Sequence, residues 1–488
     1  MNTLEKLDFD NTYARLPEVF YRRVKPTALP EPYLISFNEN AAHLIGLDAR
    51  EVSKPEFVEY FCGNKPLPGS EPISAIYAGH QFGSFVPQLG DGRAILLGEA
   101  VNETGERYDI QLKGAGLTPF SRMGDGRAVL RSTIREYLCS EAMHALGIPT
   151  TRSLCIVGSD APVYRETVET AAVLTRLAPT HVRFGSFELF YYRGQYEQVR
   201  ELADYVIAEF YPHLAQAENK YLEFLREIIN RTARLIAQWQ SVGFAHGVMN
   251  TDNMSIIGLT IDYGPFGFLD EYDEAFICNH SDYGGRYAFN QQPNVGLWNL
   301  YKLAQTLVPL VEPEEAEAAL GEYQTVFLDD FFKLMRGKLG LGTEQAEDKE
   351  LIFDLFELLQ TNQIDYTRFY RLLGNFKQSA AEKNSTLQKM FIDPASFDDW
   401  AEKYKNRLRS ENSIDDERRG RMIKINPKYI LRNHIAQQAI EKAQKGDYTE
   451  TDELLKVLQN PFNEQPEMDR FAEPPAEDAK RIVVSCSS

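Results

Sequence analysis

The chain has 488 residues, with 52 basic and 71 acidic side chains and a formal net charge of −19 at pH 7. This length predicts roughly two or three domains, and the charge argues against nucleic acid or an anionic membrane as the main partner. The five cysteines lack CxxC or metal-binding spacing, which suits a reducing, cytoplasmic compartment. No apolar run reaches the roughly eighteen residues that a membrane span requires.

The first half of the chain predicts a β-rich region. Residues 1–70 are mixed and dotted with prolines, and we expect them to pack as an N-terminal extension on a neighbouring core. Residues 71–180 predict a small antiparallel sheet, because Gly-rich turns separate short apolar runs at 94–97, 108–112 and 172–174. One helix interrupts these strands, from Arg131 to Leu146, and Gly147 with Pro149 ends it.

The second half predicts helices. In residues 181–330, apolar side chains recur at helical spacing from Tyr221 to Trp239 and predict a buried stripe. Residues 331–488 form a helical C-terminal region, whose helices include 351–359 and 430–443. The stretch from 460 to 488 carries four prolines and many acids, which predicts an extended or mobile tail. The fold class is therefore α+β.

Two carboxylates and an amide lie close together between His246 and Gly264. Counted from His246, the spacing is similar to the catalytic loop and DFG motif of protein kinases, with Asn253 and Asp262 at the metal-binding positions. Hard divalent cations that bridge phosphates need only one or two such oxygen ligands. The position of the kinase proton acceptor holds Val248, which cannot take a proton. Asp252 is the replacement candidate.

A Gly-Asp-Gly-Arg sequence occurs twice, at 90–93 and at 124–127. It is compatible with a tight hairpin turn, or with a loop whose glycines let the backbone approach phosphates that the arginine then meets. The first copy precedes Lys113 by about one hairpin, which favours the second interpretation. Lys113 and Glu136 follow in the order of the kinase β3 lysine and its helical glutamate partner.

Arg176 and Arg183 lie where the predicted sheet gives way to helices. Two arginines at such a junction could bind a polyphosphate bidentately, which lysine cannot do. The alternative is an ordinary solvated or salt-bridged arginine, and the spacing does not decide between them.

With these motifs in place, the chain resembles the SelO family (selenoprotein O, YdiU in bacteria) of pseudokinase-like protein adenylyltransferases. The resemblance covers almost the whole length and is carried by the segments 77–83, 87–94, 111–116, 124–127, 246–254 and 262–267. It implies a protein-kinase-like bilobal fold with a small, mainly β N-lobe at 71–180, a helical C-lobe at 181–330 and a helical C-terminal extension. It also implies a nucleotide bound in flipped orientation, so that AMP rather than phosphate passes to protein Ser, Thr or Tyr hydroxyls.

The resemblance also implies roles for individual residues. Asp252 would be the proton acceptor, Asn253 and Asp262 would hold Mg²⁺ or Mn²⁺, and Glu136 would form a structural ion pair. The nucleotide, ATP, would be bound by Gly90, Gly92, Arg93, Lys113, Asp125, Gly126, Arg176, Arg183 and Asp262. A redox pair is implied more weakly, between Cys278 and Cys486, because eukaryotic relatives carry selenocysteine near the C-terminus; two unrelated thiols are the alternative.

Other functions remain open. The donor could be UTP, the enzyme could be an ATP-dependent phosphotransferase, or the chain could be an inactive scaffold that only binds nucleotide. The intact set of Lys113, Asn253 and Asp262 argues against the scaffold, since a scaffold need not keep metal ligands.

Overall fold

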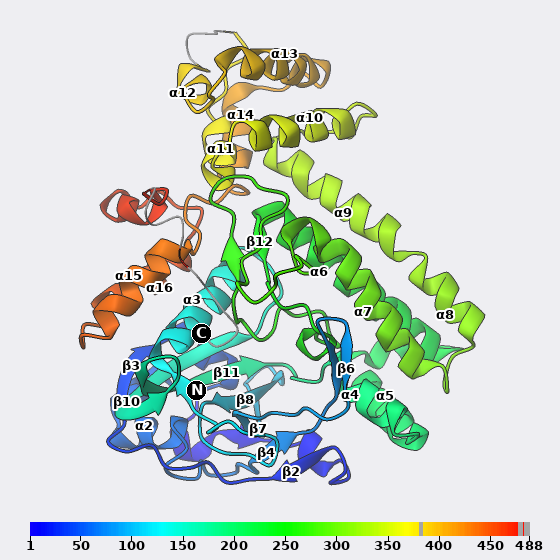
Figure 1. Cartoon of the computed structure of the whole chain (residues 1–488), viewed down its shortest axis with the longest axis vertical. Helices are drawn as coiled ribbons and strands as arrows, with labels where there is room; N and C mark the ends of the chain where they lie inside the picture. Colours follow the sequence, from blue (N-terminus) through cyan, green and yellow to red (C-terminus); the bar gives the residue numbers. More distant parts are fainter. Residues whose placement is uncertain (380–383, 477–481, 483–488) are drawn as a thin grey trace.

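The computed structural model describes residues 1–379, 384–476 and 482. In this part of the chain, a nine-stranded antiparallel sheet occupies one end of the molecule and helices occupy the rest (Figure 1). The mixed fold with a β-rich first half and a helical second half is thus confirmed. The strands of the sheet are β1 (Asp8–Phe9), β2 (Tyr21–Arg23), β3 (Tyr33–Phe37), β4 (Ile73–Ala75), β7 (Ala94–Val101), β8 (Arg107–Lys113), β9 (Ala128–Val129), β10 (Arg152–Tyr164) and β11 (Val168–Ala178).

The sheet draws strands from distant parts of the sequence. Its main path runs β2-β4-β7-β8-β11-β10-β3, with β1 paired to β7 and β9 to β11. In the centre, Lys113 of β8 pairs with Ala94 on one side and with Leu174 on the other. The first 70 residues therefore do more than cover the core, because they supply β1, β2 and β3 to the sheet itself.

Both faces of the sheet are covered, which explains why its central strands read as continuous apolar runs. On one face, Leu96 and Leu174 join the core that includes Ile134 of the helix α3 (Leu130–Ala145). On the other face, Ile95 and Leu112 join a core with the helix α2 (Pro55–Phe61). The three predicted apolar runs lie inside β7, β8 and β11.

The helix α3 begins and ends within one residue of its predicted bounds. Leu146 follows its last turn, and Gly147 then adopts φ +79°, a left-handed conformation that favours glycine. The helix carries Glu136 on its buried side, where this residue is 1% exposed. Its position under the sheet brings Glu136 toward β8 and β11.

The remaining helices extend away from the sheet. The helices α10 to α14 gather at the far end, while α15 and α16 lie beside α3 (Figure 1). Two small two-stranded sheets complete the fold: the hairpin β5–β6 (Gly79–Gln81, Ser84–Val86), and β12–β13 (Phe244–Ala245, Gly267–Phe268), whose strands are joined by a long loop. The helices are α1 (Glu39–Ala42), α4 (Phe184–Tyr192), α5 (Tyr196–Phe210), α6 (Lys220–Val242), α7 (Gln292–Leu307), α8 (Pro313–Leu320), α9 (Tyr323–Lys338), α10 (Asp348–Thr361), α11 (Tyr366–Leu373), α12 (Ser385–Gln388), α13 (Pro394–Ser410), α14 (Asp415–Met422), α15 (Asn433–Ala443) and α16 (Thr449–Leu458).

The C-terminal stretch differs in part from its prediction. Pro466–Ala472 form a 3-10 helix, and Phe471 is 2% exposed within the main core. An apolar side chain that buries itself in this way holds the segment in place, so the prediction of an extended or mobile tail was wrong for these residues. None of the helices among the described residues is both long and apolar enough to cross a membrane.

Candidate nucleotide site

A cavity of about 630 Å³ lies between the sheet region and the loops at 248–265. It brings together most of the residues that the sequence singled out: Gly90, Gly92, Arg93, Lys113, Asp125, Gly126, Arg176, Asp252, Asn253 and Asp262. Arg183, Glu136 and Cys278 do not line it. Residues as far apart in sequence as Tyr77 and Pro265 therefore share one concave surface.

Lys113, which lines the cavity, forms a buried ion pair with Glu136. The other carboxylate oxygen of Glu136 lies 2.5 Å from Nε of Arg176. Burial opposes ionisation of Glu136, but Arg176 and Lys113 outweigh it and lower the pKa of that carboxyl. Burial also lowers the pKa of Lys113 to about 8. The pair is thus held in a charged network rather than in isolation.

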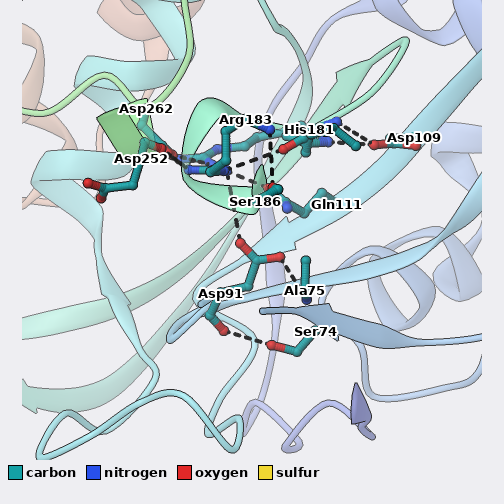
Figure 2. Close-up of polar contacts among 12 residues, drawn as sticks. Ser74, Ala75, Asp91, Asp109, Gln111, His181, Arg183, Ser186, Asp252 and Asp262 are labelled. Carbon is teal, nitrogen blue, oxygen red and sulfur yellow. Dashed lines mark hydrogen bonds and ion pairs between the residues drawn. The ribbon is translucent and has the colours of Figure 1, made fainter. Parts of the chain in front are cut away.

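Arg183 connects the two loops that carry the candidate catalytic residues. Its Nη1 donates to Asp262 Oδ2 at 2.5 Å and to the backbone carbonyl of Asp252 at 2.7 Å (Figure 2). Its guanidinium also lies 4.6 Å from the centre of the Tyr77 ring, and its Nη2 lies 4.0 Å from Asp91 Oδ1. The side chain is therefore fixed on several sides.

The carboxylate of Asp262 accepts hydrogen bonds from two arginines. Arg176 Nη1 donates to its Oδ1 at 2.8 Å, opposite the contact from Arg183. Although burial opposes it, these arginines lower the pKa of Asp262 well below its ordinary value, so that the carboxylate stays ionised. In this structure both arginines are salt-bridged, and their role in binding phosphates stays a prediction.

Behind Arg183, a second polar pair lies deep in the sheet region. His181 Nδ1 and Asp109 Oδ2 lie 2.8 Å apart, as Figure 2 shows. Burial, together with Arg176 and Arg183, lowers the pKa of His181 to about 3, so that this imidazole is neutral. A neutral ring there adds no positive charge to the two arginines that face Asp262.

Asp252 lies in the cavity with one carboxylate oxygen unused. Gln81 Nε2 donates to Oδ2 at 3.1 Å, whereas Oδ1 is buried and accepts no hydrogen bond from the described residues. Gly79 makes room for it, because a Cβ at Gly79 would lie 2.7 Å from Oδ1. Burial raises the pKa of this carboxyl to about 6. A carboxyl group with a pKa in this range can take and release a proton near neutral pH.

Asn253 and Asp262 fit a divalent cation with mixed ligands. Asn253 Nδ2 donates to the carbonyl of Val248 at 3.0 Å, which leaves its oxygen as an acceptor. No three His, Cys, Asp or Glu side chains gather as metal ligands in residues 1–379, 384–476 and 482. One carboxylate and one amide suit a hard cation that takes its other ligands from phosphate and water.

The first Gly-Asp-Gly-Arg copy is not a hairpin turn. Its residues run beside β4, where Asp91 N donates to the carbonyl of Ala75. Glycine is required here for packing, since a Cβ at Gly90 would lie 2.5 Å from the Phe120 ring and one at Gly92 would lie 2.8 Å from the Phe120 carbonyl.

The second copy also lines the cavity. Arg165 binds both oxygens of Asp125 at 2.9 Å and donates to the carbonyl of Arg127. Gly126 has φ +70°, and its carbonyl accepts from Gly116 N. The loop from Thr118 to Arg127 is thereby tied to the end of the β10–β11 hairpin.

Several cavity residues were not singled out from the sequence. Tyr77, Gln81, Asn250 and Arg165 line the cavity, and Gln81 contacts Asp252 across a separation of 171 residues. Tyr77 and Gln81 belong to a segment that carried the resemblance, which was the available signal. Nothing in the local pattern around Arg165 pointed to Asp125.

Cys278 is buried, and its Sγ donates to the carbonyl of Ala245 at 3.5 Å. Cys486 lies outside the described residues, so its pairing with Cys278 stays a prediction.

Comparison of the sequence with known proteins shows the family to which the chain belongs. The sequence model of the family described as "Protein adenylyltransferase SelO" matches residues 3–459. Proteins named "Protein nucleotidyltransferase YdiU" are 56% identical over 488 residues in Myxococcus xanthus, 58% over 489 in Thiobacillus denitrificans and 51% over 494 in Vibrio vulnificus, each covering 100% of both chains. The class of protein is therefore an enzyme, a nucleotidyltransferase. The chain belongs to the SelO protein adenylyltransferase family.

Proposed function

We propose that this chain transfers AMP from ATP to Ser, Thr or Tyr hydroxyls of other proteins and releases pyrophosphate. The observation that carries the proposal is that Asp252, a carboxyl group whose pKa is raised to about 6, lines the same cavity as Asn253 and Asp262. Val248 occupies the position of the proton-accepting residue in a kinase, so the proton must pass to a different group. A different base is consistent with a nucleotide that is bound in a different orientation. Membership of an adenylyltransferase family supports ATP as the donor.

The proposed step is a substitution at the α-phosphorus. The acceptor hydroxyl oxygen forms a bond to this phosphorus, and the bond to the oxygen that bridges the α- and β-phosphates breaks. The electron pair leaves with pyrophosphate, while the hydroxyl proton passes to Asp252. Arg93 and Lys113 would bind the departing phosphates. Both line the cavity, and Arg93 has no salt bridge to the described residues, which supports this role. Asn253 and Asp262 would hold a divalent cation, which would neutralise the charge that develops.

We further infer a kinase-like organisation in two lobes. The N-lobe comprises residues 71–180 with the extension 1–70, the C-lobe 181–330, and a helical region 331–488 follows. Support comes from the cavity, because residues from 77 to 176 line one side and residues from 248 to 265 line the other.

The test is to incubate the purified chain and an acceptor protein with ATP labelled at the α- or the γ-phosphate, with and without Mg²⁺ or Mn²⁺. Label from the α position on protein, lost on chelation, supports adenylylation. Label from the γ position means phosphotransfer, and ATP binding without any label means a scaffold. An arm with α-labelled UTP is included because the bacterial relatives are named nucleotidyltransferases without a stated base.

A further inference from the structure

One surface beside the cavity combines exposed aromatic side chains with cations. We call it the hairpin face and define it by Phe82, Tyr192, Tyr283, Arg286, Tyr301 and Lys302. They come from the β5–β6 hairpin, the end of α4 and the segment 276–307 that contains α7. Phe82, Tyr192, Tyr283 and Tyr301 are 42%, 40%, 89% and 47% exposed. Exposed large aromatic side chains in one area are typical of interaction sites.

The hairpin face begins at the candidate base. Gln81, at the hairpin tip, donates to Asp252, and its neighbour Phe82 lines the cavity. Phe82 has φ +49°, an uncommon conformation for an aromatic residue. It is held there by Asn250 and Tyr287, whose oxygens accept from its backbone N–H at 3.1 and 3.0 Å. The loop of Asp252 thus fixes an aromatic side chain at the cavity entrance.

From this entrance the hairpin face continues over α7. The guanidinium of Arg286 packs against Gly83, where an added Cβ would lie 3.3 Å from it. The same group lies 4.5 Å from the centre of the Trp298 ring. Lys302 Nζ lies 5.0 Å from the same ring. His80 also contacts Trp298, with ring centres 5.4 Å apart. The hairpin and α7 therefore form one continuous surface.

The charge of this surface is opposite to that of the protein. The segments 79–86, 184–192 and 276–307 contain only two carboxylates, Glu188 and Asp282. Both are buried: Glu188 faces His80, and Asp282 accepts from two backbone N–H groups. In the part of the chain that the structure describes, neither Arg286 nor Lys302 has a carboxylate partner. The chain as a whole has a formal net charge of −19, which would repel an acidic ligand from the rest of the surface.

We propose that the hairpin face binds the acceptor segment of the protein substrate and selects segments in which acidic and apolar residues flank the hydroxyl. The inference rests on the proposed function and names its substrate class. The aromatic side chains bury the apolar flank, Arg286 and Lys302 attract the carboxylates, and Phe82 leads the chain to Asp252. Basic segments lack this attraction and stay weakly bound.

The test uses two peptides of equal length with one Tyr acceptor, one flanked by Glu and Leu and the other by Lys and Leu. With α-labelled ATP at low salt, the acidic peptide should be modified with a kcat/KM about fivefold higher or more, and added salt should reduce this ratio. Arg286→Glu combined with Lys302→Glu should reverse the preference while the affinity for ATP stays unchanged. If the double variant folds poorly, the single variant Lys302→Glu, which changes a partly exposed side chain, should still reduce the preference for the acidic peptide.

Lys424→Glu is the matched control, because Lys424 is exposed, carries no salt bridge to the described residues and lies outside the hairpin face. It should leave the preference unchanged. Equal rates for the two peptides, or a preference that survives the double reversal, would overturn this inference alone. Absence of any α-label on protein or peptide would overturn the proposed function, and the inference with it.

Discussion

Arg183 donates through Nη1 to the backbone carbonyl of Asp252 at 2.7 Å. The same atom binds the carboxylate of Asp262, so one guanidinium sets the distance between the loop of the candidate base and a candidate metal ligand. The rest of the guanidinium lies over the Tyr77 ring and reaches Asp91 with Nη2, a set of contacts that the single nitrogen of an ammonium group cannot make at once.

Arg183→Lys should therefore lower kcat for AMP transfer by about tenfold or more, since positioning of the reacting groups is lost. The measurement is initial rate against ATP concentration, with the melting temperature as a check on folding. Arg193→Lys is the control, because Arg193 is exposed and its side chain donates to Gln88, away from Asp252 and Asp262. Equal kcat in wild type and Arg183→Lys would contradict the assigned role.

Asp252→Ala should reduce AMP transfer by about 10² to 10⁴, the usual effect of a positioned base, and leave ATP binding largely intact. Calorimetric titration with ATP and the α-label assay measure the two effects separately. Asp8→Ala, at an exposed position in β1, serves as the control. Transfer at the normal rate in Asp252→Ala would show that another group takes the proton.

Gly79→Ala tests the space beside the base. A Cβ there would lie 2.7 Å from Asp252 Oδ1, so the carboxylate must move, and kcat should fall by about tenfold or more. Gly420→Ala is matched to it: Gly420 lies in α14 with no atom within 4 Å of a Cβ, and the change should keep activity and add about 0.5–1 kcal/mol of stability. Unchanged kcat in Gly79→Ala would mean that Asp252 is not confined.

Glu136→Gln breaks a buried network, because Lys113 loses its carboxylate partner and Arg176 keeps only Asp262 of its two among the described residues. Removal of one member of such a pair costs about 3–5 kcal/mol of folding free energy. Glu209→Gln is the comparison, since the Glu209 and Arg107 pair is partly exposed and should cost less than about 1 kcal/mol. Denaturant unfolding of the three proteins checks the order, and equal losses would refute it.

Glu99 predicts a pH effect on stability. Burial, then the nearby Asp109, raise the pKa of this carboxyl from its ordinary 4.5 to about 8. Between these values the folded state binds more protons than the unfolded state, so stability falls as pH rises. Glu99→Gln stays neutral throughout, and the stability of wild type relative to it should fall by up to about 1.4 kcal/mol per pH unit in this window.

The check is denaturant unfolding of wild type and Glu99→Gln at about pH 5, 6, 7 and 8, in the window set by that pKa shift. The quantity of interest is the difference between the two proteins, since other groups titrate equally in both. A difference that does not change with pH would show that Glu99 is ionised in the folded protein.

Local pattern alone identified much of this protein. Apolar periodicity marked α3 and α6, continuous apolar runs marked β7 and β8, and spacing within one short stretch singled out Asn253 and Asp262. Such features depend on near neighbours, because a helix or strand buries one or both faces. Asn253 and Asp262 are close in sequence, so few other contacts are needed to bring them together.

Other features needed the folded chain. Gln81 reaches Asp252 across 171 residues, Arg183 lies against Asp91, and Phe471 returns to the core after a proline-rich stretch that looked extended. The hairpin face likewise exists only because β5–β6 packs beside α4 and α7. Contacts of this kind depend on the path of the whole chain in space, which sequence spacing does not encode.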